Sequence, residues 1–261
     1  MDYLTVIEAE SERFLDAARA ADPAAAVPTC PGWNAADLLW HLTDVHAFWA
    51  GILRSGAFTD EESKAVEAAK PERPADVETM SAVFREQTAQ LLAELARRND
   101  DEPAYFWLES AKTVGSTRRM QAHEATMHRV DAELTAGRPS APIDRQLADH
   151  GIAHAAEVMW AWWGTLPGFD FHPVGGVVEL APSEGTSRLL QAGRWRGTGQ
   201  SGRSYDEPGA VLVADGTPTA RAVGTAEELY RWLWGRGSEP ALSGDEAALA
   251  ALRAARDQGM Q

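Results

Sequence analysis

One segment of the chain carries residue types whose spacing suits metal chemistry. In RRMQAHEATMHRVDAELTAG, residues 118–137, Glu124 and His128 lie four positions apart. On a helix this spacing places the two side chains one above the other, projecting in the same direction. A carboxylate and an imidazole in this arrangement can supply two ligands of a metal site, and a third must come from elsewhere. A Glu–His pair at this spacing also occurs as an ordinary exposed helix pair, so the segment alone leaves both interpretations open.

The same segment has the pattern of one amphipathic helix. At about 100° per residue, one stripe collects its apolar residues: Met120, Met127, Val130 and Leu134. The helix is expected to end at Gly137, with Pro139 shortly beyond it. Glu124 falls at the edge of the stripe and His128 just past that edge. A carboxylate so close to a core is costly unless it is paired or bound to a metal.

Three neighbours of the pair differ in their expected direction. Asp131 lies on the same side of the predicted helix as Glu124. A carboxylate there can orient a ligand histidine through a hydrogen bond, although it is equally compatible with an ordinary surface position. His123 is rotated by about 100° from Glu124 and is left out of the site, and Arg129 is expected to face away from it.

Other histidines compete for a ligand role. His41 projects toward one edge of the apolar face of a predicted helix, roughly 70° from the centre of that face. A histidine in this position is either a core residue or a ligand. His46 falls at the opposite edge, about 140° from His41, so the two do not pair. His150 and His154 form a second pair four residues apart and are an alternative metal site.

The elements that must position these residues change in character along the chain. Helical periodicity predicts helices over residues 3–21, 34–54, 76–98, 118–137 and 144–164, with connections at 56–74 and 99–116. After about residue 167, short runs rich in Val and Leu predict strands at 174–180, 187–196, 209–214 and 219–223, followed by helices at 225–235 and 245–256. We therefore expect two domains, a helical bundle at 1–165 and a smaller α+β domain at 166–261.

Two of the predicted helices have sequence signals at their starts. Asn34 is a favourable N-cap, and Asp37 three residues later suits the positive end of a helix. Thr225 and Glu228 have the spacing of a capping box, in which each side chain bonds the backbone of the other residue.

Composition excludes several classes of function. The 261 residues carry a formal net charge of −15, which disfavours nucleic acid and anionic membranes as partners, and 44% are hydrophobic, enough for a sizeable core. No stretch is long and apolar enough to span a bilayer, and MDYLTVIEAESERF lacks the features of a signal peptide. A single cysteine fits a reducing cytoplasm. Ten tryptophans suggest either aromatic walls around a cavity or simple packing.

Three strings resemble one protein family. PTCPGWNAADLLWHL at residues 28–42 and the segment with Glu124, His128 and Asp131 resemble the two signatures of the mycothiol-dependent maleylpyruvate isomerase family. The tail ELYRWLWGR, followed by LSGDEAAL, resembles that family's C-terminal domain. The resemblance covers nearly the whole chain. It implies a DinB-like up-down four-helix bundle followed by a smaller α+β domain similar to sterol-carrier folds.

The resemblance also implies a set of ligands. The family's metal-binding residues fall on His41, Glu124 and His128 of this sequence. Two nitrogen donors and one oxygen donor leave a coordination position open, as in catalytic zinc sites, so Zn²⁺ is the expected metal and mycothiol the expected thiol cofactor or cosubstrate. An arginine of the C-terminal domain is implied to hold a substrate carboxylate. Arg236 is the closest match and Arg231 the alternative, although Arg236 also suits the negative end of its helix.

The implied chemistry is thiolate addition to an electrophilic small molecule. A divalent metal lowers the pKa of a bound thiol, and the resulting thiolate adds to an electron-poor double bond. If the sulfur leaves after bond rotation the enzyme is an isomerase, and if it stays the enzyme is an S-transferase. Cys30 is not needed as a nucleophile and is expected to pack in its loop. The alternative is a non-catalytic, metal-bound small-molecule binding or resistance protein.

Overall fold

The chain forms two compact units in the computed structural model, which describes residues 1–199 and 201–259. The first unit is Met1–Ala141 and the second Pro142–Gln261. The division falls earlier than the expected boundary after residue 165. The difference arises because helix α6 (Arg145–His154) packs against α7 (Ala226–Leu233) of the second unit.

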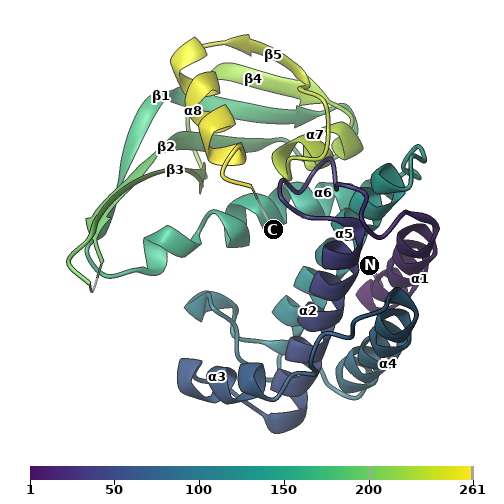
Figure 1. Cartoon of the computed structure of the whole chain (residues 1–261). Coiled ribbons are helices and arrows are strands. Elements are labelled where there is room, and N and C mark those ends of the chain that lie inside the picture. The colour runs from purple at the N-terminus through teal and green to yellow at the C-terminus, as the bar shows by residue number, and fades with distance from the viewer. Residues whose placement is uncertain (200, 260–261) are drawn as a thin grey trace. The chain divides into compact units, whose positions relative to one another are not determined.

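Four long helices form a bundle in the first unit, as predicted (Figure 1). They are α1 (Tyr3–Ala20), α2 (Ala35–Ser55), α4 (Val77–Ala96) and α5 (Val114–Thr135). Helix α1 packs against α5 and α4, and α2 packs against the same two helices. The helix that carries Glu124 and His128 is therefore held between α1 and α2.

The contacts between helices define their directions. Residues later in α2 contact residues earlier in α5. Cys30, in the loop before α2, contacts Asp131, whereas His41, further along the chain, contacts His128. Helix α2 is thus antiparallel to α5. Helix α4 runs parallel to α2, since residues later in α2 contact residues later in α4. His46 contacts Thr88, and Arg54 contacts Gln90. The long α2–α4 crossover allows this parallel arrangement. Helix α1 runs parallel to α5, since Tyr3 contacts His123 and Glu10 contacts Arg129. The bundle is therefore up-down-down-up and does not have the simple up-down alternation that was expected.

The predicted start of α2 is confirmed, whereas that of α5 is shifted. Asn34 and Asp37 form a capping box at the start of α2. Helix α5 begins at Val114, four residues before the expected start, because the Thr113 side chain caps it by accepting from the Ser116 backbone N–H. The extra turn lengthens the helix that presents the candidate ligands.

The segment 56–74 was predicted to be a loop, and this is wrong. It contains helix α3 (Asp60–Ala68), which packs against α2. Thr59 and Glu62 form a capping box, and the first turn is acidic, which suits the positive end of the helix dipole. Apolar periodicity missed the helix because Ser63 is its only buried residue.

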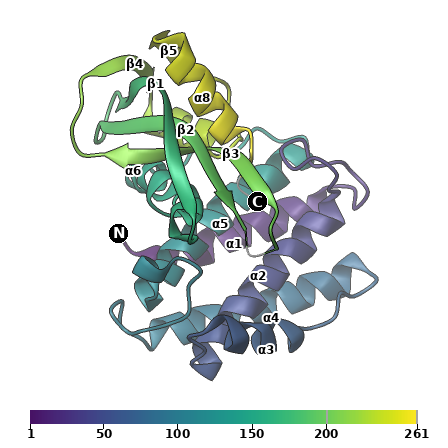
Figure 2. The same cartoon turned by 90° about the vertical axis from the view of Figure 1, so that its left-hand side faces the viewer.

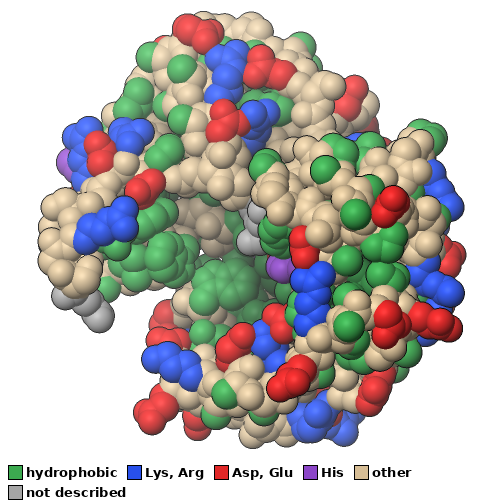
Figure 3. All heavy atoms as spheres, in the orientation of Figure 1, with side chains coloured by type: hydrophobic (Ala, Val, Ile, Leu, Met, Phe, Trp, Pro, Cys, Tyr) green, Lys and Arg blue, Asp and Glu red, His purple; other side chains and the backbone are tan. Residues whose placement is uncertain are grey.

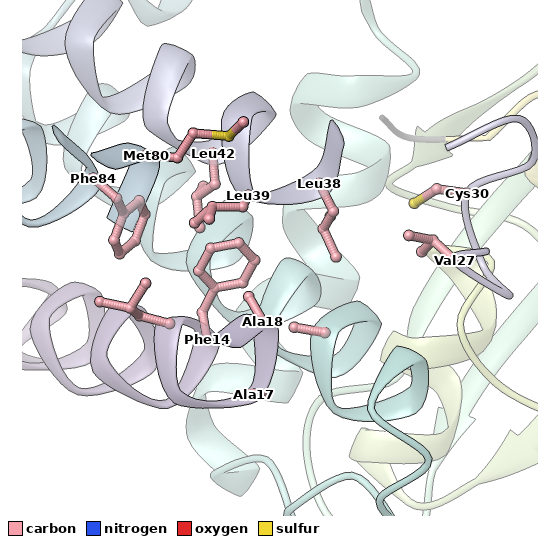
Figure 4. Close-up of a cluster of buried hydrophobic side chains, with 12 residues drawn as sticks. Phe14, Ala17, Ala18, Val27, Cys30, Leu38, Leu39, Leu42, Met80 and Phe84 are labelled. Carbon is pink, nitrogen blue, oxygen red and sulfur yellow. The ribbon is translucent and has the colours of Figure 1, made fainter. Parts of the chain in front are cut away.

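The core beside the candidate ligands is formed by apolar side chains of all four long helices, together with Val27 and Cys30 from the loop before α2 (Figure 4). Phe14 and Phe84 are its largest members, with ring centroids 5.2 Å apart. Leu38, Leu39 and Leu42 of α2 lie against them, and all three are almost fully buried. This packing fixes the rotation of α2 and with it the direction of His41.

The second unit is built on a five-stranded sheet with the order β3-β2-β1-β4-β5. The strands are β1 (Phe169–Pro182), β2 (Arg188–Thr198), β3 (Ser204–Val213), β4 (Pro218–Gly224) and β5 (Ala241–Gly244). The four predicted strands are present, and β5 was missed because it has only four residues. Helix α8 (Glu246–Arg256) packs against β1, β2 and β3 (Figure 2). The predicted α+β character of this part of the chain is confirmed.

The predicted helix at 144–164 is only partly regular. The α-helix ends at His154 and continues as a π-helical turn, Ala155–Met159, and a short 3₁₀ helix, Trp162–Thr165. The capping box of Thr225 and Glu228 at α7 is confirmed. None of the described helices is long and apolar enough to cross a membrane. On the face in Figure 3, acidic and basic side chains are interspersed.

Candidate metal centre

Helix α2 presents His41 to helix α5. The imidazole of His41 lies 4.8 Å from that of His128, measured between ring centroids, and 4.7 Å from the indole of Trp33. Its Nε2 atom is buried and has no hydrogen-bond partner among the described residues. Burial, reinforced by the neighbouring His128, lowers the pKa of His41 to about 4. The ring is therefore neutral at pH 7, with a nitrogen lone pair available to a metal.

Helix α5 supplies a carboxylate and a second imidazole. Glu124 and His128 project in the same direction, and Glu124 Oε2 lies 3.2 Å from His128 Nε2. One donor atom from each of His41, Glu124 and His128 lies within 4.8 Å of the other two. The three side chains that were predicted to bind a metal therefore lie together, although they come from two helices. A partnerless buried nitrogen beside a carboxylate and an imidazole suits a divalent ion, so these residues fit the metal that the resemblance implies.

Asp131 is fully buried and contacts the Nδ1 atom of His128. Its Oδ2 atom lies 2.8 Å from His128 Nδ1, and its two oxygens also accept from the Thr29 hydroxyl at 2.5 Å and the Cys30 thiol at 3.5 Å. A carboxylate at Nδ1 favours the tautomer in which Nδ1 carries the proton, so that Nε2, which lies beside Glu124, keeps a lone pair that can bind a metal. Burial lowers the pKa of His128, but the hydrogen bonds to Asp131 and Glu124 outweigh it, so the net shift is upward.

The loop before α2 was not expected to contribute to the site. Thr29 and Cys30 reach Asp131 from that loop, and Trp33 lies beside both His41 and His128. Cys30 is buried in the core, and it also forms a second group of potential ligands with His128 and Asp131. The signal for these contacts was the string PTCPGW, whose position next to the His41 helix is visible in the sequence.

His46 has a separate environment. Its Nδ1 atom lies 2.9 Å from the hydroxyl of Thr88, and its ring stacks on Phe84 at 5.4 Å. Complete burial lowers the pKa of His46 to about 3. As predicted from the helical angles, His46 and His41 do not form a pair.

The alternative pair on α6 lacks a third ligand among the described residues. Among the described residues, two groups of side chains could bind a metal ion. Both contain His128, and neither includes His150 or His154. His154 is buried and stacks on Trp234, with ring centroids 6.1 Å apart. Its contact with Trp234 gives this histidine a packing role.

The remaining predicted residues are engaged within their own units. Arg236 follows α7, is 5% exposed and donates from Nη1 to the carbonyl of Trp234 at 2.6 Å. Arg231 pairs with Glu227 at 3.5 Å. Assignment of either arginine to a substrate carboxylate stays a prediction. Arg129, expected to face away from the site, is fully buried and joins α5 to α1.

The fold and the convergent side chains define a two-unit protein whose N-terminal helical bundle carries a His–Glu–His set. Residues 4–133 match the family described as the mycothiol maleylpyruvate isomerase N-terminal domain. The N-terminal unit of this chain therefore belongs to the family of mycothiol maleylpyruvate isomerase N-terminal domains.

Solved structures extend the likeness to the rest of the fold. The chain is similar to a crystal structure of the mycothiol-dependent maleylpyruvate isomerase, with 14% identity, a TM-score of 0.58 and coverage of 93% of this chain and 92% of that one. A histidine-to-alanine mutant of that enzyme gives 13% identity and a TM-score of 0.59 over the same shares. At these identities the likeness establishes a common fold. No curated protein matches the sequence.

Proposed function

We propose that this protein is a metal- and mycothiol-dependent enzyme that adds a thiolate to an electrophilic small molecule, as an isomerase or an S-transferase. The observation that carries the proposal is the convergence of one donor atom each of His41, Glu124 and His128, together with the buried Nε2 of His41, which has no hydrogen-bond partner among the described residues. Membership of the family adds the thiol, because the family description names mycothiol.

Three side chains would hold the ion, and zinc suits them. Two imidazole nitrogens and one carboxylate oxygen are a common ligand set of catalytic zinc, in which the fourth position remains for a water or a substrate atom. When bound, the ion would lower the pKa of a thiol that occupies this fourth position. Neutral His41 presents a lone pair without first losing a proton, whereas His128, whose pKa is raised, presents its Nε2 lone pair in the neutral form that keeps the proton on Nδ1.

Two further residues have proposed supporting roles. Asp131 is a positioning residue, since it holds His128 Nδ1 and thereby directs Nε2. Arg236 is our candidate for the cation that binds a substrate carboxylate, because a guanidinium matches the two oxygens of such a group. Arg231 is less suitable because it already pairs with Glu227.

Isomerisation and transfer share the first step. The thiolate sulfur forms a bond to one carbon of a double bond conjugated with a carbonyl, and the π electrons move to the carbonyl oxygen. In isomerisation the new single bond rotates, the electrons return, and the carbon–sulfur bond breaks to release the thiolate. In transfer the adjacent carbon takes up a proton and the carbon–sulfur bond remains. Both outcomes are therefore compatible with one site.

The test combines metal analysis with a thiol assay. The purified protein is expected to contain about one zinc ion per chain and to accelerate the reaction of mycothiol with a bimane electrophile. His41→Ala and His128→Ala should lose both the metal and the acceleration, whereas His46→Asn should retain both. Bound zinc without acceleration would favour the non-catalytic binding protein. Protein that binds no zinc when zinc is supplied would refute the proposal.

A further inference from the structure

The loop between α1 and α2 is closed by its own backbone hydrogen bonds. The N–H of Val27 donates to the carbonyl of Trp33 at 2.9 Å, and the N–H of Trp33 donates to the carbonyl of Cys30 at 3.1 Å. Pro28 and Pro31 lie within this turn, and a proline ring fixes the backbone angle φ at about −65°. The residues between Val27 and Trp33 are therefore held in one conformation beside the start of α2.

Thr29 ties this loop to α5. Its hydroxyl donates to Oδ1 of Asp131 at 2.5 Å, although the two residues are 102 positions apart in the sequence. Asp131 is fully buried and Thr29 is partly buried. Hydrogen bonds to a carboxylate are shorter and stronger than those between neutral groups, so this contact restrains the Asp131 side chain as well as the loop.

The two oxygens of Asp131 have different partners. Oδ2 lies 2.8 Å from Nδ1 of His128, whereas Oδ1 accepts from the Thr29 hydroxyl. The torsion that turns a carboxylate about its Cβ–Cγ bond has a broad minimum, so the backbone of α5 leaves the plane of this group weakly defined. A bond to Oδ1 fixes that plane and thereby places Oδ2 beside Nδ1 of His128.

Cys30 supplies a weaker restraint on the same carboxylate. Its thiol lies 3.5 Å from Oδ2, the oxygen that His128 also contacts. A thiol is a weak donor, and a contact with Oδ2 alone allows the carboxylate to turn about that atom. The Thr29 hydroxyl bonds the opposite oxygen and resists this rotation.

From this arrangement we propose that Thr29 is a positioning residue of the metal centre. Its hydroxyl holds Asp131, Asp131 holds Nδ1 of His128, and Nε2 of His128 is thereby directed toward the zinc ion. The inference rests on the proposed function, since it takes His128 as a zinc ligand. It predicts an effect on metal affinity and requires no contact of Thr29 with the metal, the thiol or the substrate.

A purely structural role of Thr29 would have different consequences. If the hydroxyl only attached the loop to α5, its loss would lower the urea midpoint of the metal-free protein without changing the affinity of the folded protein for zinc. Positioning predicts that the zinc affinity of the folded protein falls. Measurement of both quantities therefore separates the two roles.

Thr29→Val tests the inference, because valine replaces the hydroxyl by a methyl group. The full chain is titrated with zinc in competition with a chromogenic chelator, and urea unfolding is measured without metal. Thr29→Val should bind zinc about three- to tenfold more weakly, as expected for one lost hydrogen bond. Thr29→Ser, which keeps the hydroxyl, should bind zinc as the parent protein does.

Two further variants show whether the effect passes through the Asp131 carboxylate. The Thr135 hydroxyl donates to the backbone carbonyl of Asp131 at 2.7 Å, so Thr135→Val is a matched control that should keep the zinc affinity of the parent. Asp131→Ala removes the carboxylate. In that background Thr29→Val should cause no further loss, because residues that act through one another have non-additive effects.

Specific outcomes would overturn the inference. These are the parent affinity for zinc in Thr29→Val, no rescue by Thr29→Ser, an equal loss in Thr135→Val, or a full additional loss when Thr29→Val is added to Asp131→Ala. Zinc binding without acceleration of the mycothiol reaction would refute the enzymatic function and leave this inference intact. A parent protein that binds no zinc when zinc is supplied would refute both.

Discussion

Asp131 Oδ2 lies 2.8 Å from Nδ1 of His128, one turn further along the same buried face of α5. This contact decides which nitrogen of His128 is presented to Glu124, and it links the loop before α2 to the candidate ligands through Thr29 and Cys30. A carboxylate that binds the rear nitrogen of a ligand histidine fixes the ring and increases its basicity. The relationship leads to a direct test of the metal centre.

Asp131→Asn should weaken zinc binding about 10- to 100-fold, the usual cost of losing such a partner. The amide removes the negative charge that favours the Nδ1-protonated form of His128. The measurement is a competition titration with a chromogenic zinc chelator. Glu133→Gln is the matched control, because Glu133 is a carboxylate of the same helix that bonds Arg129 instead of a histidine. Equal losses in the two variants would mean that Asp131 acts only through the stability of α5.

His41→Ala and His46→Asn should separate a ligand from a core histidine on the same helix. His41 Nε2 has no hydrogen-bond partner in the described chain, whereas His46 Nδ1 is bonded to Thr88. His41→Ala should therefore abolish stoichiometric zinc binding at little cost in stability. His46→Asn should retain zinc but lower the unfolding midpoint. Zinc content by mass spectrometry and urea unfolding measure the two effects, and full zinc retention by His41→Ala would remove it from the ligand set.

How much of this site could be predicted from the sequence depends on whether a pattern within one helix or a contact between two helices decides each position. Helical periodicity is local, so it placed Glu124 and His128 on one face correctly. Convergence with His41 depends on how α2 packs on α5, and no pattern within either helix contains that information. The family resemblance supplied it. The contacts of Thr29 and Cys30 with Asp131 were missed because a loop has no period from which side-chain directions can be calculated.

The fold shows the same limits. Long amphipathic helices and Val-rich strands were predicted, since each buries an apolar face. Helix α3 was missed because its pattern is nearly all polar, although the Thr59–Glu62 capping box was a usable signal. Arg129 was expected to face away from the site and is fully buried, because α1 covers that side of α5 and supplies Glu10 as its partner.

Stability of the metal-free protein should fall at acidic pH through His46. Burial lowers the pKa of His46 to about 3 from the ordinary histidine value of 6.5. Below pH 6.5 the unfolded chain therefore binds a proton that the folded chain excludes, so the contribution is present above that pH and is lost as the pH falls toward 3. The expected slope is about 1.4 kcal/mol per pH unit in this window.

The comparison of His46→Asn with the parent protein isolates this contribution. Both proteins retain His41, whose pKa is lowered in the same direction, and His128, whose pKa is raised. Urea unfolding at pH 7, 6 and 5 gives the free energy of unfolding of each. The parent should lose more stability than the variant as the pH falls, and parallel curves would show that His46 is not excluded from protonation in the folded state.

Arg129→Leu should destabilise the bundle by about 3–5 kcal/mol, the usual cost of breaking a buried ion pair. The guanidinium is fully buried and donates to Glu10 at 2.7 Å and to Glu133 at 2.8 Å. Its loss deprives both carboxylates of this buried cation and leaves Glu10 with the exposed Arg13. Arg13→Ala is the control. Arg13 also pairs with Glu10, but its side chain is 55% exposed, and such pairs contribute at most about 1 kcal/mol.

The triple variant Arg129→Leu, Glu10→Gln, Glu133→Gln distinguishes unpaired charge from lost packing. Removing both carboxylate charges should recover part of the stability lost in Arg129→Leu, because the main cost of the single change is the uncompensated negative charge between α1 and α5. Urea unfolding at pH 7 provides the free energies. No recovery in the triple variant would assign the cost to the packing of the Arg129 side chain and not to its charge.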